Sequence, residues 1–527
     1  MKNIKNQIND IHSKNDYSLS KSLCFLLIIF IASIVIRLYY LPFDLPLLLD
    51  AQHYFWYAND MSILKEIPTH YSSHNNFWAS FLSIFFSVNS SDNILDFMNI
   101  QRILSTILSS LTIFPLFFLC KKFFLNKYSL LGSLLFIFDP RLIMNSLQGI
   151  IEPIYFLIGI SIILFSFSNS KFFYFISFGL AAILSLIRYE GLLILIPLTI
   201  IYFWKFKINK KSILTYSLCI LIFILVLFPM VDARIHATGH DGIISHISDG
   251  PATISNTLAG NEIGKDRVDI ENSIINSLSF LGWITIPVWI MFLPYGLFKY
   301  FKNFDQKKSI LLIFSVILIL PALYAYSRDF QETRYLYILF PLFSIISIYS
   351  IQKINQIKNF KIIFILIIFG IIFSSIGWLE YKWIDKEYEQ EAFTLSLKIK
   401  EMTTGINEFY PESAYFQFIN LNEKFPNLRN QINNEHNLIS ISQYDEIKEL
   451  LQNEKNNGLT HIVIDQSQIP NNLRQEFLIE IYENENNYTF LKKIYDSSND
   501  GFNYKLKVFE INYDLFDKHM KILNNLN

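Results

Sequence analysis

The sequence predicts a polytopic α-helical membrane protein with about eleven spanning helices and a water-soluble α/β domain at its C-terminal end. Hydrophobic residues make up 52% of the 527 residues and charged residues only 17%, and the chain contains 50 Phe and 29 Tyr. Lipid demands such a composition, whereas chain length does not. The formal net charge of −1 argues against a nucleic-acid-binding protein, because such proteins concentrate positive charge to neutralise phosphates.

Apolar stretches mark the expected spans. A helix needs roughly 20 apolar residues to cross about 30 Å of hydrocarbon, and somewhat fewer where flanking side chains or the bilayer adapt. We expect spans near residues 22–41, 103–120, 128–139, 150–168, 172–187, 190–204, 212–230, 274–298, 309–326, 335–352 and 361–379. The first stretch has no small-residue cleavage site, so we expect a retained span and not a removed signal peptide.

Lysine residues predict the orientation of these spans, because cytoplasmic loops are enriched in Lys and Arg. The N-terminal tail is basic, and so is every second loop after it. The lysines concerned are Lys2, Lys5, Lys14 and Lys21; Lys121, Lys122 and Lys127; Lys171; Lys205, Lys207, Lys210 and Lys211; Lys299, Lys302, Lys307 and Lys308; Lys353, Lys358 and Lys361. We therefore expect a multi-pass protein of the plasma membrane whose N-terminus is cytoplasmic.

This topology divides the chain into three regions. We expect a cytoplasmic tail over residues 1–21 and a transmembrane domain over 22–380, with long external loops at 42–102 and 231–273. An odd number of spans places the remaining residues, 381–527, on the extracytoplasmic side. Their composition is typical of a soluble α/β domain.

Local patterns predict elements inside these regions. In the first long loop, the aromatic-rich residues 50–57 and the apolar run 77–88 indicate helices that lie along the membrane interface. In the C-terminal domain we expect a helix over 384–402, a strand over 460–464, and a hairpin that joins 490–495 to 504–511. The second long loop is polar and Gly-rich, as functional or mobile loops usually are.

Ionisable residues gather at the external ends of the spans. Such residues are costly at a membrane boundary unless they face water or a cavity. They are Asp50, Arg102, Asp139, Arg141, Glu152, Arg188, Glu190, Arg328, Asp329, Glu332 and Arg334. The sequence therefore predicts a site, assembled from several loops, that meets a lipid head group and a water-soluble partner together.

Asp50 has the strongest functional context of this set. On a helix beginning there, Asp50, His53 or Tyr54, Tyr57 and Asp60 share one face. The alternative is that Asp50 only caps the helix. We expect Asp60 to be a solvated surface residue. We expect His53 to be a hydrogen-bonding neighbour and not a metal ligand, because no second ligand stands at suitable spacing.

The remaining acids and arginines have both a structural and a functional interpretation. Arg188 with Glu190, and Arg334 with Glu332, are either interfacial ion pairs or planar forks for phosphate oxygens, which Lys cannot match. Glu152 precedes a proline and either complements a helix dipole or takes part in the chemistry. The Asp139-Pro140 pair is typical of a turn that ends a span.

These landmarks, in this order, resemble the glycosyltransferase superfamily with the membrane-embedded GT-C fold. The matching segments are Leu49-Asp50-Ala51-Gln52-His53-Tyr54, Asn99-Ile100-Gln101-Arg102-Ile103-Leu104, Asp139-Pro140 to Glu152-Pro153, Ile187-Arg188-Tyr189-Glu190-Gly191-Leu192, and Thr333-Arg334-Tyr335 with Pro341. The likeness covers roughly residues 20–380. Protein O-mannosyltransferases carry an Asp-Glu pair where Asp50 is followed by Ala51, and oligosaccharyltransferases carry a Trp-Trp-Asp signature that does not occur here. The chain therefore looks most like a generic family 39 or Rgt-like transferase.

The resemblance implies an inverting sugar transfer at the extracytoplasmic face, from a polyprenyl- or dolichyl-phosphate-linked donor to a glycan, lipid or protein acceptor. It implies that Asp50 acts as the base, activates the acceptor or holds a metal, and that Arg188 and Arg334 hold the donor phosphate. Asp50 and Glu152 are thus the candidate catalytic residues. The candidate substrate-binding residues are His53, Tyr54, Arg102, Arg188, Glu190, Glu332, Arg334 and Tyr335.

Two other classes of function compete with this interpretation. A transporter or flippase for lipid-linked sugars would place ionisable residues near the bilayer midplane and would commonly contain internal repeats. Here the middles of the spans are nearly uncharged. A non-catalytic scaffold would not explain the acids and arginines at one membrane face. We expect no cofactor. A divalent metal is compatible with this chemistry, but the sequence offers no convincing set of oxygen ligands for one.

Overall fold

The computed structural model describes the chain in two compact units. The first consists of residues 1–41, 53–89 and 98–380, and the second of residues 42–52, 90–97 and 381–527. Within them, the structure describes residues 16–69, 71, 76–91, 93–243, 270–302, 304–328, 330–354, 360–402, 406–410, 444, 446–456, 458–466 and 476–526. Asp329 and residues 244–269 of the second long loop lie outside the described residues.

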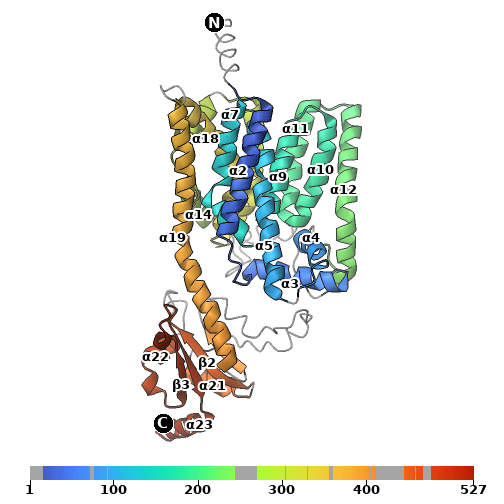
Figure 1. The fold of residues 1–527 in the computed structure, drawn as a ribbon. Helices are drawn as coiled ribbons and strands as arrows, with labels where there is room; N and C mark the ends of the chain where they lie inside the picture. Colours follow the sequence, from blue (N-terminus) through green and yellow to red (C-terminus); the bar gives the residue numbers. More distant parts are fainter. Residues whose placement is uncertain are drawn as a thin grey trace. The chain divides into compact units, whose positions relative to one another are not determined.

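The first unit is built from helices, most of which stand side by side in Figure 1, whereas α3 (Leu49–Leu64) lies across their lower ends. They are α2 (Leu19–Tyr39), α3 (Leu49–Leu64), α4 (Asn76–Phe86), α5 (Ile94–Leu111), α6 (Ile113–Cys120), α7 (Asn126–Ile137), α8 (Pro140–Leu147), α9 (Glu152–Ser166), α10 (Lys171–Ile187), η1 (Tyr189–Ile194), α11 (Leu195–Phe206), α12 (Lys210–Thr238), α14 (Ile270–Thr285), α15 (Leu293–Lys302), α16 (Gln306–Leu318), α17 (Leu320–Ser327), η2 (Thr333–Leu339), α18 (Phe340–Ile354) and α19 (Phe360–Met402). The first residues of α3 and α5 and the last part of α19 belong to the second unit. The expected polytopic helical fold is confirmed.

The number of full-length spans differs from the expected eleven or so. Among the described residues, seven helices are long and apolar enough to cross a membrane, and α7 with α8, bent by 52°, makes up to eight. The stretches predicted at 150–168 and 172–187 form α9 and α10, of only 15 and 17 residues. The stretch at 274–298 is broken between α14 and α15, around Pro287. Apolar composition alone does not reveal such breaks.

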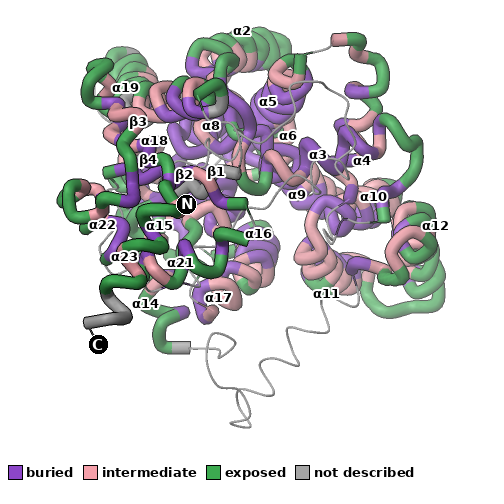
Figure 2. The backbone as a smooth tube through the Cα atoms, turned by 90° about the horizontal axis from the view of Figure 1, so that it is seen from below, coloured by how far each residue is buried: buried purple, intermediate pink, exposed green. Residues whose placement is uncertain are grey.

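Lipid-facing surface explains the exposed apolar side chains of the first unit. On α12, Leu214, Leu225 and Phe228 are 66%, 61% and 59% exposed, and Phe373 of α19 is 79% exposed. Figure 2 shows the exposed residues running along α12. In water this would be a large unfavourable patch, whereas a lipid-facing helix requires it.

The lysine-bearing loops lie at one end of the first unit. The Lys307 ammonium donates to the Lys122 carbonyl oxygen at 2.7 Å, and the Lys205 ammonium donates to the Ser166 carbonyl oxygen at 2.8 Å. Asp16 accepts the backbone N–H of Lys127 at 3.1 Å. Because Ser166 ends α9, the first residue of α9 lies at the opposite end of the same helix. Lys205 and Glu152 therefore lie at opposite ends of α9.

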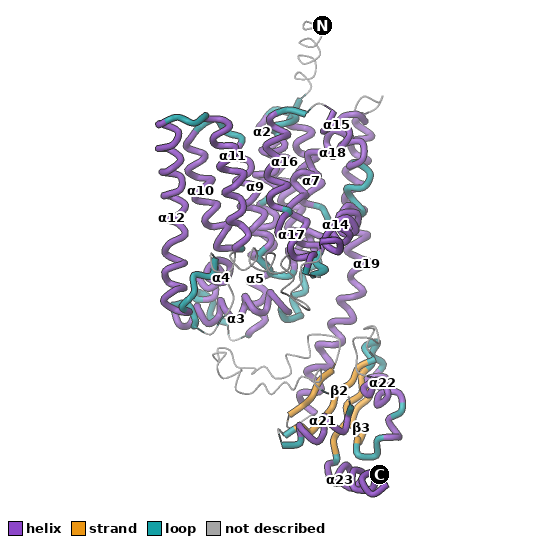
Figure 3. The backbone as a smooth tube through the Cα atoms, turned by 180° about the vertical axis from the view of Figure 1, so that it is seen from behind, coloured by secondary structure: helices purple, strands orange, loops and turns teal. Residues whose placement is uncertain are grey.

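The second unit contains a four-stranded sheet of order β1-β2-β4-β3, formed by β1 (Ile406–Tyr410), β2 (Leu459–Asp465), β3 (Leu491–Asp496) and β4 (Leu506–Ile511). β1 pairs with β2 in parallel, and the other pairs are antiparallel. Figure 3 shows the strands beside the helices α21 (Ile447–Glu454), α22 (Glu476–Glu483) and α23 (Tyr513–Leu526). The expected strand at 460–464 and the expected hairpin are both present.

The sheet of the second unit separates two apolar clusters. Ile462, Ile464 and Phe509 pack with the helices α21 and α22, whereas Val463 and Val508 pack with Leu395 and other residues of α19. Alternate residues of β2 therefore enter different clusters, as the two-residue period of a strand requires. The helix expected at 384–402 is the last part of α19.

An arginine is fully buried inside the first unit. The guanidinium of Arg37 on α2 donates to the hydroxyl of Ser146 at 3.1 Å, the hydroxyl of Ser109 at 3.3 Å, and the carbonyl oxygens of Ser33 and Ile137 at 3.3 and 3.0 Å. These acceptors lie on α2, α5, α7 and α8. One side chain thus links four helices, and polar atoms from each compensate its lost hydration.

We expect Arg37→Ala to destabilise the protein by about 2 kcal/mol, because interhelical hydrogen bonds contribute about 0.6 kcal/mol each on average and the stranded acceptors stay buried. Thermal unfolding in detergent measures the change. Val35→Ala, on the same helix but 59% exposed, is the matched control and should have little effect. Equal melting temperatures for the two variants would contradict a structural role for the Arg37 network.

Candidate functional site

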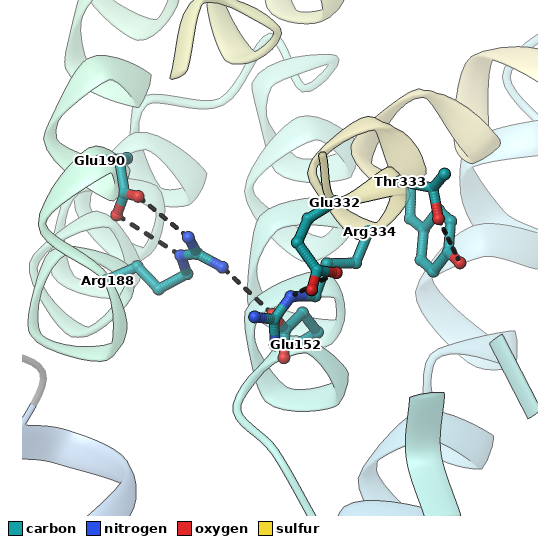
Figure 4. Close-up of polar contacts among 7 residues, drawn as sticks. Glu152, Arg188, Glu190, Glu332, Thr333 and Arg334 are labelled. Atoms are coloured by element: carbon teal, nitrogen blue, oxygen red, sulfur yellow. Dashed lines mark hydrogen bonds and ion pairs between the residues drawn. The ribbon is translucent and has the colours of Figure 1, made fainter. Parts of the chain in front are cut away.

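A buried carboxylate begins α9. The side chain of Glu152 is only 4% exposed, and its Oε1 lies 3.2 Å from Nη1 of Arg188 and 3.6 Å from Nη1 of Arg334. Pro153 occupies the first turn of α9, where its missing N–H costs nothing. Figure 4 shows the two guanidinium groups converging on Glu152 from different segments. One carboxylate oxygen is therefore shared by two cations.

Arg188 is the more firmly held of the two arginines. It follows α10 in an extended conformation and contacts both oxygens of Glu190, with Nη2–Oε1 and Nε–Oε2 distances of 3.0 and 3.4 Å. Its guanidinium also lies 5.3 Å from the ring centre of Tyr335. Burial alone would lower the pKa of Arg188, but the carboxylates of Glu190 and Glu152 outweigh it and hold that pKa well above its usual value.

Arg334 makes longer contacts. It lies in η2, its side chain is 23% exposed, and its Nε is 3.5 Å from Oε2 of Glu332, while its distance to Glu152 is 3.6 Å. Glu332 is itself 54% exposed. These distances exceed those of ordinary charge-assisted hydrogen bonds, about 2.7–2.9 Å. A bound anion would therefore displace Arg334 from its partners more easily than Arg188.

Six predicted residues thus come together: Glu152, Arg188, Glu190, Glu332, Arg334 and Tyr335. They come from three segments, at the start of α9, after α10, and at the start of η2. The ion pair between Arg188 and Glu190, which the sequence suggested, is present. The bridge through Glu152 was not predicted, because no local spacing connects it to either arginine.

Asp50 belongs to the second unit. It is exposed and lies in the first turn of α3, where a carboxylate complements the helix dipole. The preceding residue, Leu49, has a positive φ of 50°, a left-handed conformation that costs an L-residue roughly 1–2 kcal/mol. Strained residues of this kind cluster at functional sites. The turn that Leu49 makes sets the position of Asp50 at the start of the helix.

The other predicted residues of the first long loop surround Tyr71. The ring of His53 lies 5.6 Å from that of Tyr71, and the Tyr71 hydroxyl donates to Oδ2 of Asp60 at 2.8 Å. Tyr54 is buried and 6.1 Å from His53. Asp60 is only 1% exposed, so the expectation of a solvated surface residue was wrong. An aromatic partner covers this face of α3, and sequence spacing within the helix could not reveal it.

Arg102 does not open a span. Because α5 begins at Ile94, Arg102 lies in its middle, where it is buried and donates to Oδ1 of Asn99 at 3.3 Å. The apolar stretch predicted at residues 103–120 thus begins inside a helix, because the polar residues before it, including Asn99, already belong to α5.

Asp139 has the structural role that its sequence suggested. Its carboxylate caps α8 by accepting the backbone N–H of Arg141 at 3.0 Å, and it accepts the Trp289 indole N–H at 2.8 Å. Arg141 in turn donates to the Trp283 carbonyl oxygen at 2.8 Å and packs over the ring of Trp378. Within the described residues, no group of three or more His, Cys, Asp or Glu side chains forms a candidate metal site.

Comparisons with known proteins identify the fold. No protein-family model matches the sequence, and no curated protein does. The structure is similar to ArnT from Cupriavidus metallidurans bound to undecaprenyl phosphate, with 8% identity, 94% of this chain and 98% of that chain covered, and a TM-score of 0.51. It is also similar to the oligosaccharyltransferase AglB from Archaeoglobus fulgidus in complex with an inhibitory peptide and a dolichol-phosphate, with 11% identity, 84% and 69% covered, and a TM-score of 0.51. The apo form of the A. fulgidus enzyme gives 0.52 at the same identity and coverage. The chain therefore has the GT-C fold that its sequence predicted.

Gly191 is expected to be essential for the geometry of the arginine turn. A Cβ at this position would lie 2.6 Å from the Leu184 carbonyl oxygen, which is backbone and cannot move aside. We expect Gly191→Ala to cost about 1–3 kcal/mol, as overpacking does, and to disturb Arg188. Gly159→Ala on α9 is the control, because a Cβ there meets nothing within 4 Å. A lower melting temperature for Gly159→Ala than for Gly191→Ala would contradict this packing.

Proposed function

We propose that this chain is a membrane glycosyltransferase, a hexosyl- or pentosyltransferase, that moves a sugar from a polyprenyl- or dolichyl-phosphate donor to an acceptor. The observation that carries the proposal is the cluster of Arg188 and Arg334 around the buried Glu152. Two proteins with the same fold are bound to undecaprenyl phosphate and to dolichol-phosphate. A guanidinium pair at the ends of apolar helices suits a ligand of this kind, with one charged group and a long apolar chain.

Arg334 is the proposed ligand of the donor phosphate. Its contact to the exposed Glu332 is long, so a phosphate can replace that contact while Arg334 stays beside Glu152. Arg188 is fixed by Glu190 and adds its charge without moving. As the bond between the sugar and the phosphate breaks, its electron pair goes to the phosphate oxygen, so the leaving phosphate gains a further negative charge. Fixed cations in a partly dry site stabilise that charge more strongly than water does.

Asp50 is the proposed base. An attacking hydroxyl of the acceptor, whether glycan, lipid or protein, needs a carboxylate within hydrogen-bond reach. Attack from the face opposite the phosphate would invert the anomeric carbon. Since the phosphate leaves ionised, the reaction requires no strong general acid. The proposal includes no cofactor and no metal ion, and it places the reaction on the extracytoplasmic side of the plasma membrane, away from the lysine-bearing loops.

A transporter or flippase of lipid-linked sugars is the alternative. Transporters bind their substrates near the bilayer midplane, on discontinuous helices. The arginine cluster instead lies where α9 begins and α10 ends. A position at the ends of helices favours transfer at the membrane boundary over passage through the bilayer.

Asp50→Asn should leave the protein folded, because Asp50 is exposed, and should lower sugar transfer by about 10²–10⁴-fold, the usual contribution of a general base. The assay follows labelled sugar from a polyprenyl-phosphate donor in purified membranes. Asp44→Asn, in the same external segment, is the control and should retain transfer. Transfer at the wild-type rate by Asp50→Asn would remove Asp50 from the mechanism.

Arg334→Ala should raise the KM for the donor roughly 10–100-fold while changing the KM for the acceptor little, because a hydrogen bond to a charged group contributes about 1.5–3 kcal/mol. Saturation curves for the donor, measured with excess acceptor, and for the acceptor, measured with excess donor, give the two KM values separately. Arg328→Ala, nearby in sequence, serves as the matched loss of charge. Equal shifts for donor and acceptor would argue for a purely structural role of Arg334.

A further inference from the structure

Only one of the two oxygens of the Glu152 carboxylate contacts protein partners. Oε1 contacts both arginines, whereas Oε2 is buried and accepts no hydrogen bond from the described residues. More than about 90% of buried polar groups have a partner, and a buried acceptor without one costs roughly 1–3 kcal/mol. An ionised oxygen left in this state, in a cluster that otherwise pairs its charges, indicates a position for a ligand atom.

The chemistry of Oε2 restricts that ligand atom. An ionised carboxylate only accepts hydrogen bonds, so its partner must be a donor. The donor phosphate is excluded, because its oxygens are ionised acceptors that the carboxylate repels. A sugar carries several hydroxyl donors, and in the proposed substrate it is attached directly to the phosphate that Arg334 would hold. A hydroxyl or amino group of the transferred sugar therefore fits Oε2.

We propose that Glu152 recognises the transferred sugar by accepting a hydrogen bond from one of its hydroxyl or amino groups at Oε2, while Oε1 holds Arg188 and Arg334. This inference rests on the proposed function. It separates two tasks within one cluster: the arginines bind the phosphate common to all such donors, and Glu152 distinguishes donors by their sugar. Since the two arginines fix Oε1, the direction of Oε2 is fixed as well, and only a suitably placed hydroxyl can reach it.

A structural role alone does not account for this arrangement. A carboxylate that only complements the dipole of α9 could stay in water, where its charge costs nothing. Glu152 is instead 4% exposed on its side chain. A carboxylate that only orients the arginines would need Oε1 and no more. Neither role uses the second buried oxygen, whereas recognition of a sugar does.

Paired lipids test the inference with the full-length protein in detergent. The probes are undecaprenyl phosphate alone and undecaprenyl phosphate carrying glucose, mannose, galactose or a pentose, and the readout is the dissociation constant of each. We expect the wild type to bind one sugar-bearing lipid more tightly than the bare lipid. Glu152→Gln should weaken that sugar-bearing lipid about 10-fold, because a charge-assisted hydrogen bond becomes a neutral one, and should change the bare lipid less than 2-fold.

Two variants serve as comparisons. Arg334→Ala should weaken the bare and the sugar-bearing lipid alike, because both present the phosphate. Asp139→Asn removes another buried carboxylate, one that is paired with Trp289, and should leave the preference for the sugar unchanged even if stability falls. Together they separate a loss of sugar contact from a loss of phosphate contact and from a loss of buried charge.

Each other outcome overturns the inference. If Glu152→Gln weakens both lipids equally, Glu152 acts only through the arginines. If the wild type binds no sugar-bearing lipid more tightly than the bare lipid, Oε2 contacts water and not sugar. If the wild type binds neither kind of lipid, the proposed function fails as well. The binding of bare undecaprenyl phosphate thus distinguishes a failure of the inference from a failure of the function.

Discussion

The arrangement of the site depends on one constraint, that an ionised group can be buried only where charged or polar partners replace its lost hydration. Glu152 is buried at the start of α9, so the structure must bring cations to it. They come from the turn after α10 and from η2, 36 and more than 180 residues away along the chain. One carboxylate oxygen therefore contacts guanidinium groups from two other segments of the chain. The pairing is required because burying the Glu152 charge without a partner would cost several kcal/mol of desolvation free energy.

The same constraint has a different solution deeper in the first unit. Arg37 is completely buried, and its recorded partners among the described residues are serine hydroxyls and carbonyl oxygens. Neutral acceptors satisfy all sides of this guanidinium, so it suits a structural link between helices. In the arginine cluster the partners are carboxylates, which a phosphate of like charge can replace. The chemical nature of the partners thus separates Arg37 from the arginines that we propose as phosphate ligands.

The sequence predicted the structure well wherever composition or the spacing of nearby residues determines it. Apolar runs revealed most helices, and the strand β2 and the hairpin of β3 with β4 were predicted. The turn predicted at Asp139-Pro140 is present between α7 and α8. The predictions failed where the burial or the contacts of a residue depend on a segment far away in the sequence. Asp60 is buried and accepts a hydrogen bond from Tyr71, and the contacts of Glu152 come from Arg188 and Arg334. No pattern within one segment contains that information.

The charges in the cluster also determine how a donor can bind. Three carboxylates accompany two guanidinium groups, so the cluster already has more negative than positive formal charge. A phosphate therefore cannot be added without breaking an existing ion pair. It must take over a cation that a carboxylate now holds. Glu332 can lose its arginine partner at the smallest cost in free energy, because its carboxylate is 54% exposed and water can solvate it, whereas Glu152 and Glu190 are largely buried. Donor binding should therefore exchange the Glu332 contact of Arg334 for a phosphate contact and leave the Glu152 bridge in place. That exchange leaves Oε2 of Glu152 free to accept a hydrogen bond from the sugar.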